Sequence, residues 1–287
     1  MILSELFVSF ILYSFLGWVW ETIYCTVREK RFQNRGFLFG PVCPIYGSCI
    51  VFVQLMCRFG QGLVDEKAPV WRVFLICAAG SAVAEYLTSW YLEERFHARW
   101  WDYSDMPLNV NGRICLPVTL CFGAAGAVIV RLILPWIEEA GHMIPPLAWE
   151  AASLLLMGLF AADLALTEAE LNALLQKMQN VENEFNRRAE AAYSTLAGTP
   201  QQLETGVRAL EEEFRGRMRS AAESLSAGQR LILDNIRTFR PARAMRYPLH
   251  AGQKLKEAWL EIRSRSAEED GKEDREEDRY RGDGSDR

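Results

Sequence analysis

The sequence lacks the motifs of several common enzyme classes. It contains no G-x-x-x-x-G-K-[S/T] loop to hold ATP phosphates and no G-x-S-x-G turn of the serine hydrolases. Its three histidines, His97, His142 and His250, lie in separate segments, and no H-E-x-x-H occurs. The sequence therefore predicts no cofactor, no metal site and no catalytic residue, and it favours a role other than catalysis.

Cysteine pairs of the C-x-x-C type are also absent. The chain has seven cysteines, an odd number, and most of them lie within apolar runs. In such surroundings cysteine behaves as a small hydrophobic residue. We expect structural thiols.

Basic residues are missing from the N-terminal region. No Lys or Arg precedes Arg28, and no small-x-small cleavage pattern follows the first apolar run. A cleaved signal peptide needs both features. The first apolar run is therefore predicted to be a retained transmembrane helix.

The net charge of −5 is concentrated at one end of the chain. Residues 266–287 contain five Lys/Arg and ten Asp/Glu, so the remainder is neutral. A neutral remainder argues against a nucleic-acid partner. The charged segment 264–287 has few apolar residues and is predicted to be disordered.

Long apolar runs dominate the first 167 residues. A bilayer core of ~30 Å requires about 20 apolar helical residues. Five runs approach this length, at about 3–27, 44–63, 70–92, 116–137 and 147–167. The fifth could instead be an interfacial helix. The predicted fold class is all-α, a polytopic bundle of about five transmembrane helices spanning residues 1–167, with the lipid bilayer as its first partner.

The loops predict an orientation in the membrane. The first and third loops hold seven Lys/Arg, and the opposite side holds four. Because cytoplasmic loops are enriched in basic residues, we expect the N-terminus outside and the C-terminus in the cytosol, in a multi-pass protein of the cell membrane.

Three acidic residues are predicted to lie at one membrane face. Glu21, Glu85 and Asp163 lie near the ends of the first, third and fifth runs, which would point in the same direction. Carboxylates that face lipid are costly, so they should face the bundle or a wet cavity. Alternatively, Glu21 and Glu85 could snorkel to the interface, or pair with Arg35 or Arg113 as a structural clasp.

Two loops emerge at the same face. The first, residues 34–47, contains several glycines and two prolines, and its part before Pro44 should be non-helical. The third begins with Trp100-Trp101-Asp102-Tyr103-Ser104 and continues to Asn109 and Arg113. Its aromatic residues are typical of an interfacial belt. Its polar residues Asp102, Asn109 and Arg113 could cap the loop or line a polar vestibule.

These segments carry a family resemblance. The matching stretches are Tyr13-Ser14-x-x-Gly17-Trp18-x-x-Glu21, Asn34-Arg35-Gly36-Phe37-Leu38-x-Gly40-Pro41-x-Cys43-Pro44-Ile45-Tyr46-Gly47, Glu85-Tyr86, Trp100-Trp101-Asp102-Tyr103-Ser104 and Asn109-x-Asn111-Gly112-Arg113-Ile114-Cys115-Leu116. They resemble the ABC-transporter type IV family, also called CmpB-like permeases, over residues 1–130. The resemblance implies a permease, whose ATPase would be a separate chain. It carries no substrate and no residue role.

The region 168–263 predicts cytosolic helices. Apolar residues recur at seven-residue intervals from Leu164 to Ala192, and a second series runs from Leu203 to Ile232. Gly198 and Pro200 separate the two. The pattern indicates an antiparallel helical hairpin or an oligomeric coiled coil, with Arg188 and Arg217 at core-like positions.

The leading hypothesis is a transport-related membrane protein with a polar site at the cytosolic end of the bundle. Glu21 and Glu85 would bind a cation, a proton or a cationic substrate, while Arg35 and Arg113 balance these charges or contact an anionic group. Self-association into a homo-oligomer is a plausible addition to such a small bundle. The alternatives are a membrane enzyme acting on lipid or cell-envelope intermediates, and a membrane scaffold that recruits cytosolic partners through its helical tail.

Overall fold

A computed structural model describes residues 2–30, 32, 34–60, 62–65, 67–141, 143–195, 200–239 and 252–265. The disordered segment predicted for 264–287 lies outside the described residues from 266 onward. Residues 264 and 265 end a helix over 252–265. The chain divides into two compact units. The first comprises residues 1–170 together with 235–238, and the second comprises 171–234 and 239–287.

The first unit is built from apolar helices, so the predicted all-α membrane fold is confirmed. In chain order the helices are α1 (Ile2–Glu29), α2 (Pro44–Phe59), α3 (Val70–Phe96), α4 (Leu116–Val128), the π-helical turn η1 (Ile129–Ile133), α5 (Leu134–Gly141) and α6 (Pro146–Thr195). Among the described residues, four helices are long and apolar enough to cross a membrane: Ile2–Glu29, Val70–Phe96, Leu116–Gly141 and Pro146–Arg188.

The second expected span is shorter than predicted. Helix α2 has 16 residues, which at ~1.5 Å per residue make about 24 Å, less than a bilayer core. It begins at Pro44, a residue suited to a first helical turn. The residue before it, Cys43, is extended. The difference lies at the other end, because the helix ends at Phe59 with Gly60 as its C-cap and does not continue to Leu63.

Close packing between these helices depends on small residues. A Cβ on Gly17 of α1 would clash with the ring of Tyr46 in α2, and one on Gly126 of α4 would clash with Cys77 in α3. Small residues at such contacts let membrane helices approach closely. An apolar cluster of buried residues lies beside these contacts and contains Tyr13, Val64, Ala68, Val73, Cys77, Ala127, Val130 and Leu134.

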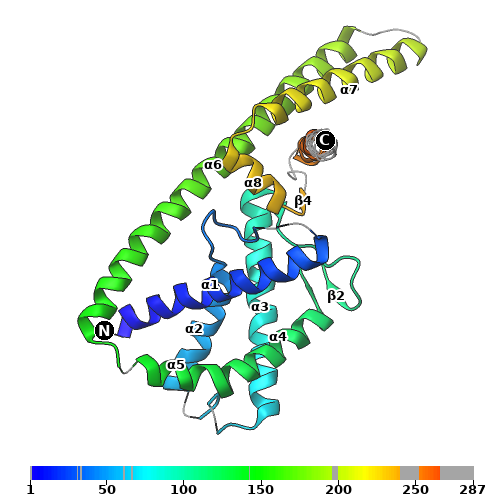
Figure 1. Cartoon of the computed structure of the whole chain (residues 1–287). Coiled ribbons are helices and arrows are strands. Elements are labelled where there is room, and N and C mark those ends of the chain that lie inside the picture. Colours follow the sequence, from blue (N-terminus) through cyan, green and yellow to red (C-terminus); the bar gives the residue numbers. More distant parts are fainter. Residues whose placement is uncertain are drawn as a thin grey trace, which may run out of the picture. The chain divides into compact units, whose positions relative to one another are not determined.

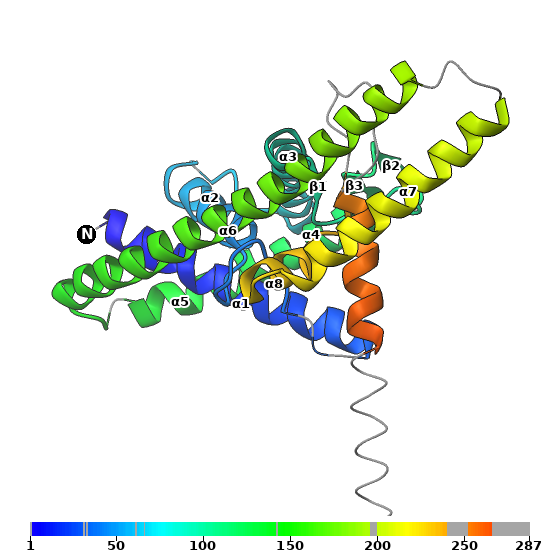
Figure 2. The same ribbon diagram turned by 90° about the horizontal axis from the view of Figure 1, so that it is seen from above.

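The first and third helices do not run side by side. In Figure 2, α3 is seen almost end-on, whereas α1 extends across the view, and Figure 1 also shows α1 crossing α3. The expectation that the two helices run in the same direction is therefore wrong. Helix α1 packs on α2, and α3 packs on α4. These tertiary contacts set the crossing, and the lengths of the apolar runs could not predict it.

Short strands organise the third loop. They are β1 (Ala98–Arg99), β2 (Asn109–Val110) and β3 (Ile114–Cys115), and β2 pairs antiparallel with β3. The turn between them has positive φ at Asn111 (54°) and at Gly112 (68°). Positive φ is easily adopted by glycine and tolerated by asparagine. Strand β4 (Thr238–Phe239) pairs with β1.

The second unit contains an antiparallel helical hairpin. The second unit comprises the end of α6, α7 (Pro200–Glu223), α8 (Ala227–Asn235) up to Asp234, and the helix over 252–265. The end of α6 and α7 form the hairpin. Phe185 packs against Phe214, with ring centroids 5.1 Å apart, and Lys177 Nζ donates to the Ser224 carbonyl at 3.0 Å. Partners thus move backward along α7 as α6 advances. Of the two predicted arrangements, the chain itself contains the hairpin.

The two arginines at core-like positions of this hairpin share one acidic partner. Arg188 lies 2.5 Å from Glu213, and Arg217 lies 3.1 Å from the same carboxylate. All three side chains are partly exposed, so the arginines lie at the edge of the seam and need not be buried in it.

Candidate functional site

The first loop, residues 34–43, enters the first unit between its helices. The Cys43 amide donates to the carbonyl of Ser14, halfway along α1, at 2.9 Å. Leu38 is fully buried, and the Phe37 ring packs against Phe96 and Trp100 with centroids 5.9 and 5.3 Å apart. Irregular backbone at membrane depth occurs only where protein surrounds it. These contacts supply that surrounding.

Asp163 of α6 holds this loop. Its carboxylate accepts hydrogen bonds from the amides of Phe39 (3.1 Å) and Gly40 (2.9 Å). A Cβ on Gly40 would lie 2.7 Å from Asp163 Oδ2, so the contact requires glycine. Asp163, predicted as part of a polar site, is thus engaged by backbone donors, and its role in the structure is to position the loop.

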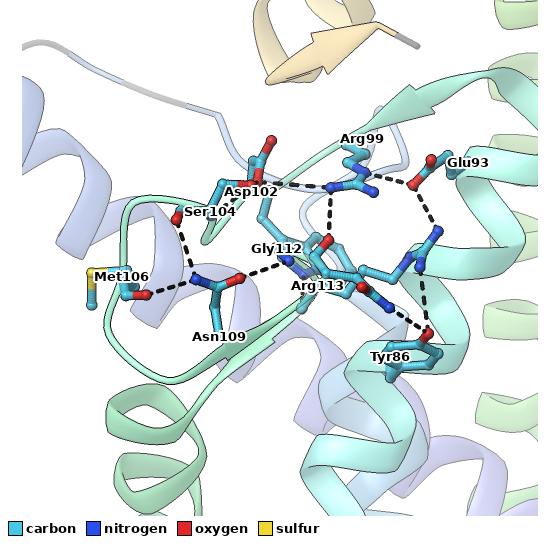
Figure 3. Close-up of polar contacts among 11 residues, drawn as sticks. Tyr86, Glu93, Arg99, Asp102, Ser104, Met106, Asn109, Gly112 and Arg113 are labelled. Atoms are coloured by element: carbon cyan, nitrogen blue, oxygen red, sulfur yellow. Dashed lines mark hydrogen bonds and ion pairs between the residues drawn. The ribbon is translucent and has the colours of Figure 1, made fainter. Parts of the chain in front are cut away.

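The third loop is held by its own polar network, which Figure 3 shows. Glu93 at the end of α3 lies 2.5 Å from Arg99 and 3.0 Å from Arg113. The Arg113 guanidinium also lies over the Tyr86 ring, 5.3 Å from its centroid. Arg113 was expected to balance the charge of Glu21 or Glu85, or to contact an anionic group. In the structure it is paired with Glu93.

Asp102 and Asn109 serve the folding of the same loop. Asp102 accepts a hydrogen bond from the Ser104 hydroxyl at 2.5 Å and lies 3.8 Å from Arg99. Asn109 donates to the carbonyl of Met106 at 2.8 Å and accepts from the amide of Gly112 at 3.1 Å. Both residues therefore cap turns of this loop.

The two remaining carboxylates each receive a tyrosine hydroxyl. Tyr46 donates to Glu21 Oε2 at 2.8 Å, and Tyr103 donates to Glu85 Oε1 at 3.3 Å. The Tyr103 amide is fixed by a 2.8 Å bond to the Gly112 carbonyl. Glu85 is only 7% exposed, and its Oε2 has no hydrogen-bond partner among the described residues.

Tyr103 lies within electrostatic range of both carboxylates. Burial, then the charges of Glu85 and Glu21, and the hydrogen bond to Glu85 raise the pKa of the Tyr103 phenol far above its ordinary value. The phenol therefore stays a donor at physiological pH. Because the charges of Glu21 and Glu85 both act on the Tyr103 phenol, the two carboxylates belong to the same electrostatic environment, although α1 and α3 cross.

Arg35 lies close to this environment without forming an ion pair among the described residues. Its carbonyl accepts from the Cys43 thiol at 3.7 Å, and its Nε is buried without a hydrogen-bond partner in the described part of the chain. Burial, then the charges of Glu21 and Cys25, raise the pKa of the Cys43 thiol to about 12. The sequence placed Arg35 beside the carboxylates, and the structure gives it no direct bond to either.

A short segment that follows the helices of the second unit in the sequence belongs to the first unit, and the sequence analysis did not predict it. This segment, residues 235–238, is called the strap here. Asn235 Nδ2 donates to the Gly36 carbonyl at 3.2 Å, and the Arg237 amide donates to the Arg99 carbonyl at 2.7 Å. Ile236 between them is fully buried. The strap therefore bonds to both the first and the third loop.

The tyrosine partners were also missed, although their motifs were noticed. Tyr46 follows Pro44 in the first-loop motif, and Tyr103 lies in the aromatic run of the third loop. A tyrosine hydroxyl in a loop at the same membrane face as a predicted buried carboxylate could have indicated these hydrogen bonds. In the described residues, no group of three or more His, Cys, Asp or Glu side chains is arranged to hold a metal ion.

Comparison with known families identifies the first unit. A family model described as "Putative ABC-transporter type IV" matches residues 8–168, more than half of the chain. The chain belongs to this family. The resemblance seen in the motifs is thereby confirmed, and the ABC-transporter type IV match covers α1 to α4 and the membrane part of α6. No curated protein and no solved structure matches the chain.

Proposed function

We propose that this protein is the membrane-embedded component of an ABC-type transport system, and that Glu21 and Glu85 form its polar site. The family and the four apolar helices support a transport-related membrane protein. The finer proposal rests on one observation. Two carboxylates share one site, and each is bonded only to a neutral phenol in the described part of the chain.

The electrostatics of this arrangement favour a positively charged ligand. A carboxylate away from water is costly unless it is paired, and a second carboxylate nearby raises the cost. Charged groups inside membrane proteins commonly mark ion or substrate pathways. Arg99 and Arg113 are engaged by Glu93, and Arg35, the nearest other arginine, bonds to neither carboxylate among the described residues. A cation or proton at the site would remove the cost.

Energy would come from a second protein. The chain has no phosphate-binding loop for ATP, so an ABC-type system would require a separate ATPase subunit. We count α2 as a fifth crossing and place the N-terminus outside and the second unit in the cytosol, because the first and third loops hold most of the basic residues between the helices. The polar site would then lie at the cytosolic end.

The test is a pair of charge-neutralising variants, Glu21→Gln and Glu85→Gln, in cells that lack the native gene. Glu5→Gln is the matched control, because Glu5 lies on α1 and pairs only loosely, at 3.7 Å, with the exposed Arg58. Solutes inside and outside the cells are profiled at equal protein level. We expect wild type and Glu5→Gln to restore the profile that deletion disturbs, and neither site variant to do so. Full restoration by both site variants would overturn the proposal.

A scaffold remains the second candidate, favoured by one observation. The second unit has a core of its own, with Leu171, Leu174, Met218 and Leu233 buried in it. A scaffold predicts that removing residues 168–287 abolishes function while both Glu→Gln variants are tolerated. The same solute profiles therefore separate the two candidates.

A further inference from the structure

Glu85 is in an unusual position for an acidic side chain. It is 7% exposed, its Oε1 accepts one long hydrogen bond of 3.3 Å from a neutral phenol, and its Oε2 has no partner in the described structure. A buried carboxylate that is ionised usually accepts two or three hydrogen bonds or pairs with a cation. Glu85 has neither arrangement.

The groups that face Glu85 do not supply a positive charge. Helix α1 contributes Glu21, and the third loop contributes Tyr103. Helix α2 contributes the Cys49 thiol, which lies within electrostatic range of Glu85, and Tyr46, which is bonded to Glu21. Helix α4, Leu116–Val128, contains no Asp, Glu, Lys, Arg or His. The described surroundings of Glu85 are therefore neutral or negative.

The two carboxylates of the site differ in a consistent direction. Glu21 is partly exposed and accepts a 2.8 Å bond from Tyr46, whereas Glu85 is buried and its bond from Tyr103 is longer. Where two carboxylates share a site, one commonly keeps a proton. Burial disfavours the charged form of a carboxyl group, so Glu85, the buried one with an unpartnered oxygen, is the one placed to keep the proton.

We propose that Glu85 is a proton-binding site, with the proton held on Oε2 at neutral pH and Glu21 as the neighbouring carboxyl group of the same site. The step is a simple equilibrium: the carboxylate of Glu85 takes one proton from water and becomes a carboxylic acid, and no other bond changes. This inference deepens the proposed function, since it names the proton as a ligand of the same site. The bound proton removes one of the two negative charges.

Infrared spectroscopy of the purified full-length protein in lipid nanodiscs tests the protonation directly. We expect a carboxylic-acid C=O band at neutral pH that shifts in deuterated buffer and disappears as the pH is raised. The band should be lost in Glu85→Gln and kept in Glu5→Gln. Its absence from the wild type at neutral pH, or its persistence in Glu85→Gln, would overturn the inference.

A second variant keeps the test independent of the folding of Glu85→Gln. In Glu21→Gln the neighbouring negative charge is gone, so Glu85 should release its proton at lower pH than in the wild type. An unchanged titration of the band would contradict the pairing. The spectrum does not depend on transport, so a protonated Glu85 combined with normal solute profiles in the Glu→Gln variants would refute the proposed function alone.

Discussion

Asp163 is a carboxylate in a membrane helix, and its hydrogen bonds go to backbone amides. Charge-assisted bonds of this kind contribute about 1.5–3 kcal/mol each. Substituting Asp163 by Ala leaves the amides of Phe39 and Gly40 without this acceptor. We expect Asp163→Ala to lower the thermal unfolding midpoint in detergent. Glu168→Ala, an exposed residue on the same helix, is the control, and equal midpoints for the two variants would contradict the assignment.

Cys43 gives a second prediction at the residue level. The thiolate is the reactive form of cysteine, and the pKa of the buried Cys43 thiol is raised to about 12. We therefore expect N-ethylmaleimide to label Cys43 slowly at neutral and mildly alkaline pH in the folded protein, and rapidly after denaturation in SDS. Mass spectrometry of the labelled peptide gives both rates. Equal rates in the two states would show that Cys43 is not buried.

Among the elements, the strap has the most specific prediction. Asn235 bonds to the carbonyl of Gly36, and a Cβ on Gly36 would lie 3.5 Å from the Cys43 sulfur. Loss of the Asn235 side chain should loosen the first loop at this point. We expect Asn235→Ala to increase the maleimide labelling rate of Cys43 several-fold. Asn180→Ala, at an exposed position of α6, should leave the rate unchanged. Labelling as slow as in the wild type would show that the strap does not hold the loop.

The apolar helices were predictable because hydropathy and length report directly on a bilayer. The carboxylates were predictable as candidates because an acidic residue within an apolar run is costly and rare. Their partners were not. Tyr46 reaches Glu21 because its ring packs on Gly17, a tertiary contact with no sequence period. Arg113 could pair with any nearby acid, and Glu93 is selected by the fold of the third loop.

The strap shows the same limit more strongly. Residues 235–238 bond to loops that lie more than one hundred positions earlier in the chain. Neither helical periodicity nor composition marks them, because four residues hold too little pattern. The hairpin of the second unit lies between these cases. Its apolar seams were visible in the sequence, but the antiparallel direction of the two helices is shown only by the contacts of Phe185 with Phe214 and of Lys177 with Ser224.

At the scale of the whole molecule, the account predicts sidedness. The proposed orientation, with the N-terminus outside and α2 counted as a fifth crossing, predicts that the second unit lies in the cytosol. Protease added to spheroplasts should leave this region intact, and protease added to inverted membrane vesicles should remove it. A C-terminal epitope tag reports the result on an immunoblot. Cleavage in spheroplasts and protection in vesicles would reverse the orientation and place the polar site outside.

The central claim is that Glu21 and Glu85 form one site, and a double-mutant cycle tests it most directly. Thermal unfolding is measured in detergent at alkaline pH for the wild type, Glu21→Gln, Glu85→Gln and the double variant. Either single substitution removes the same repulsion. We therefore predict that each raises stability and that the double variant adds little, with a coupling of about 0.5–3 kcal/mol. Two changes that simply add would show that the carboxylates are independent, and would contradict the account.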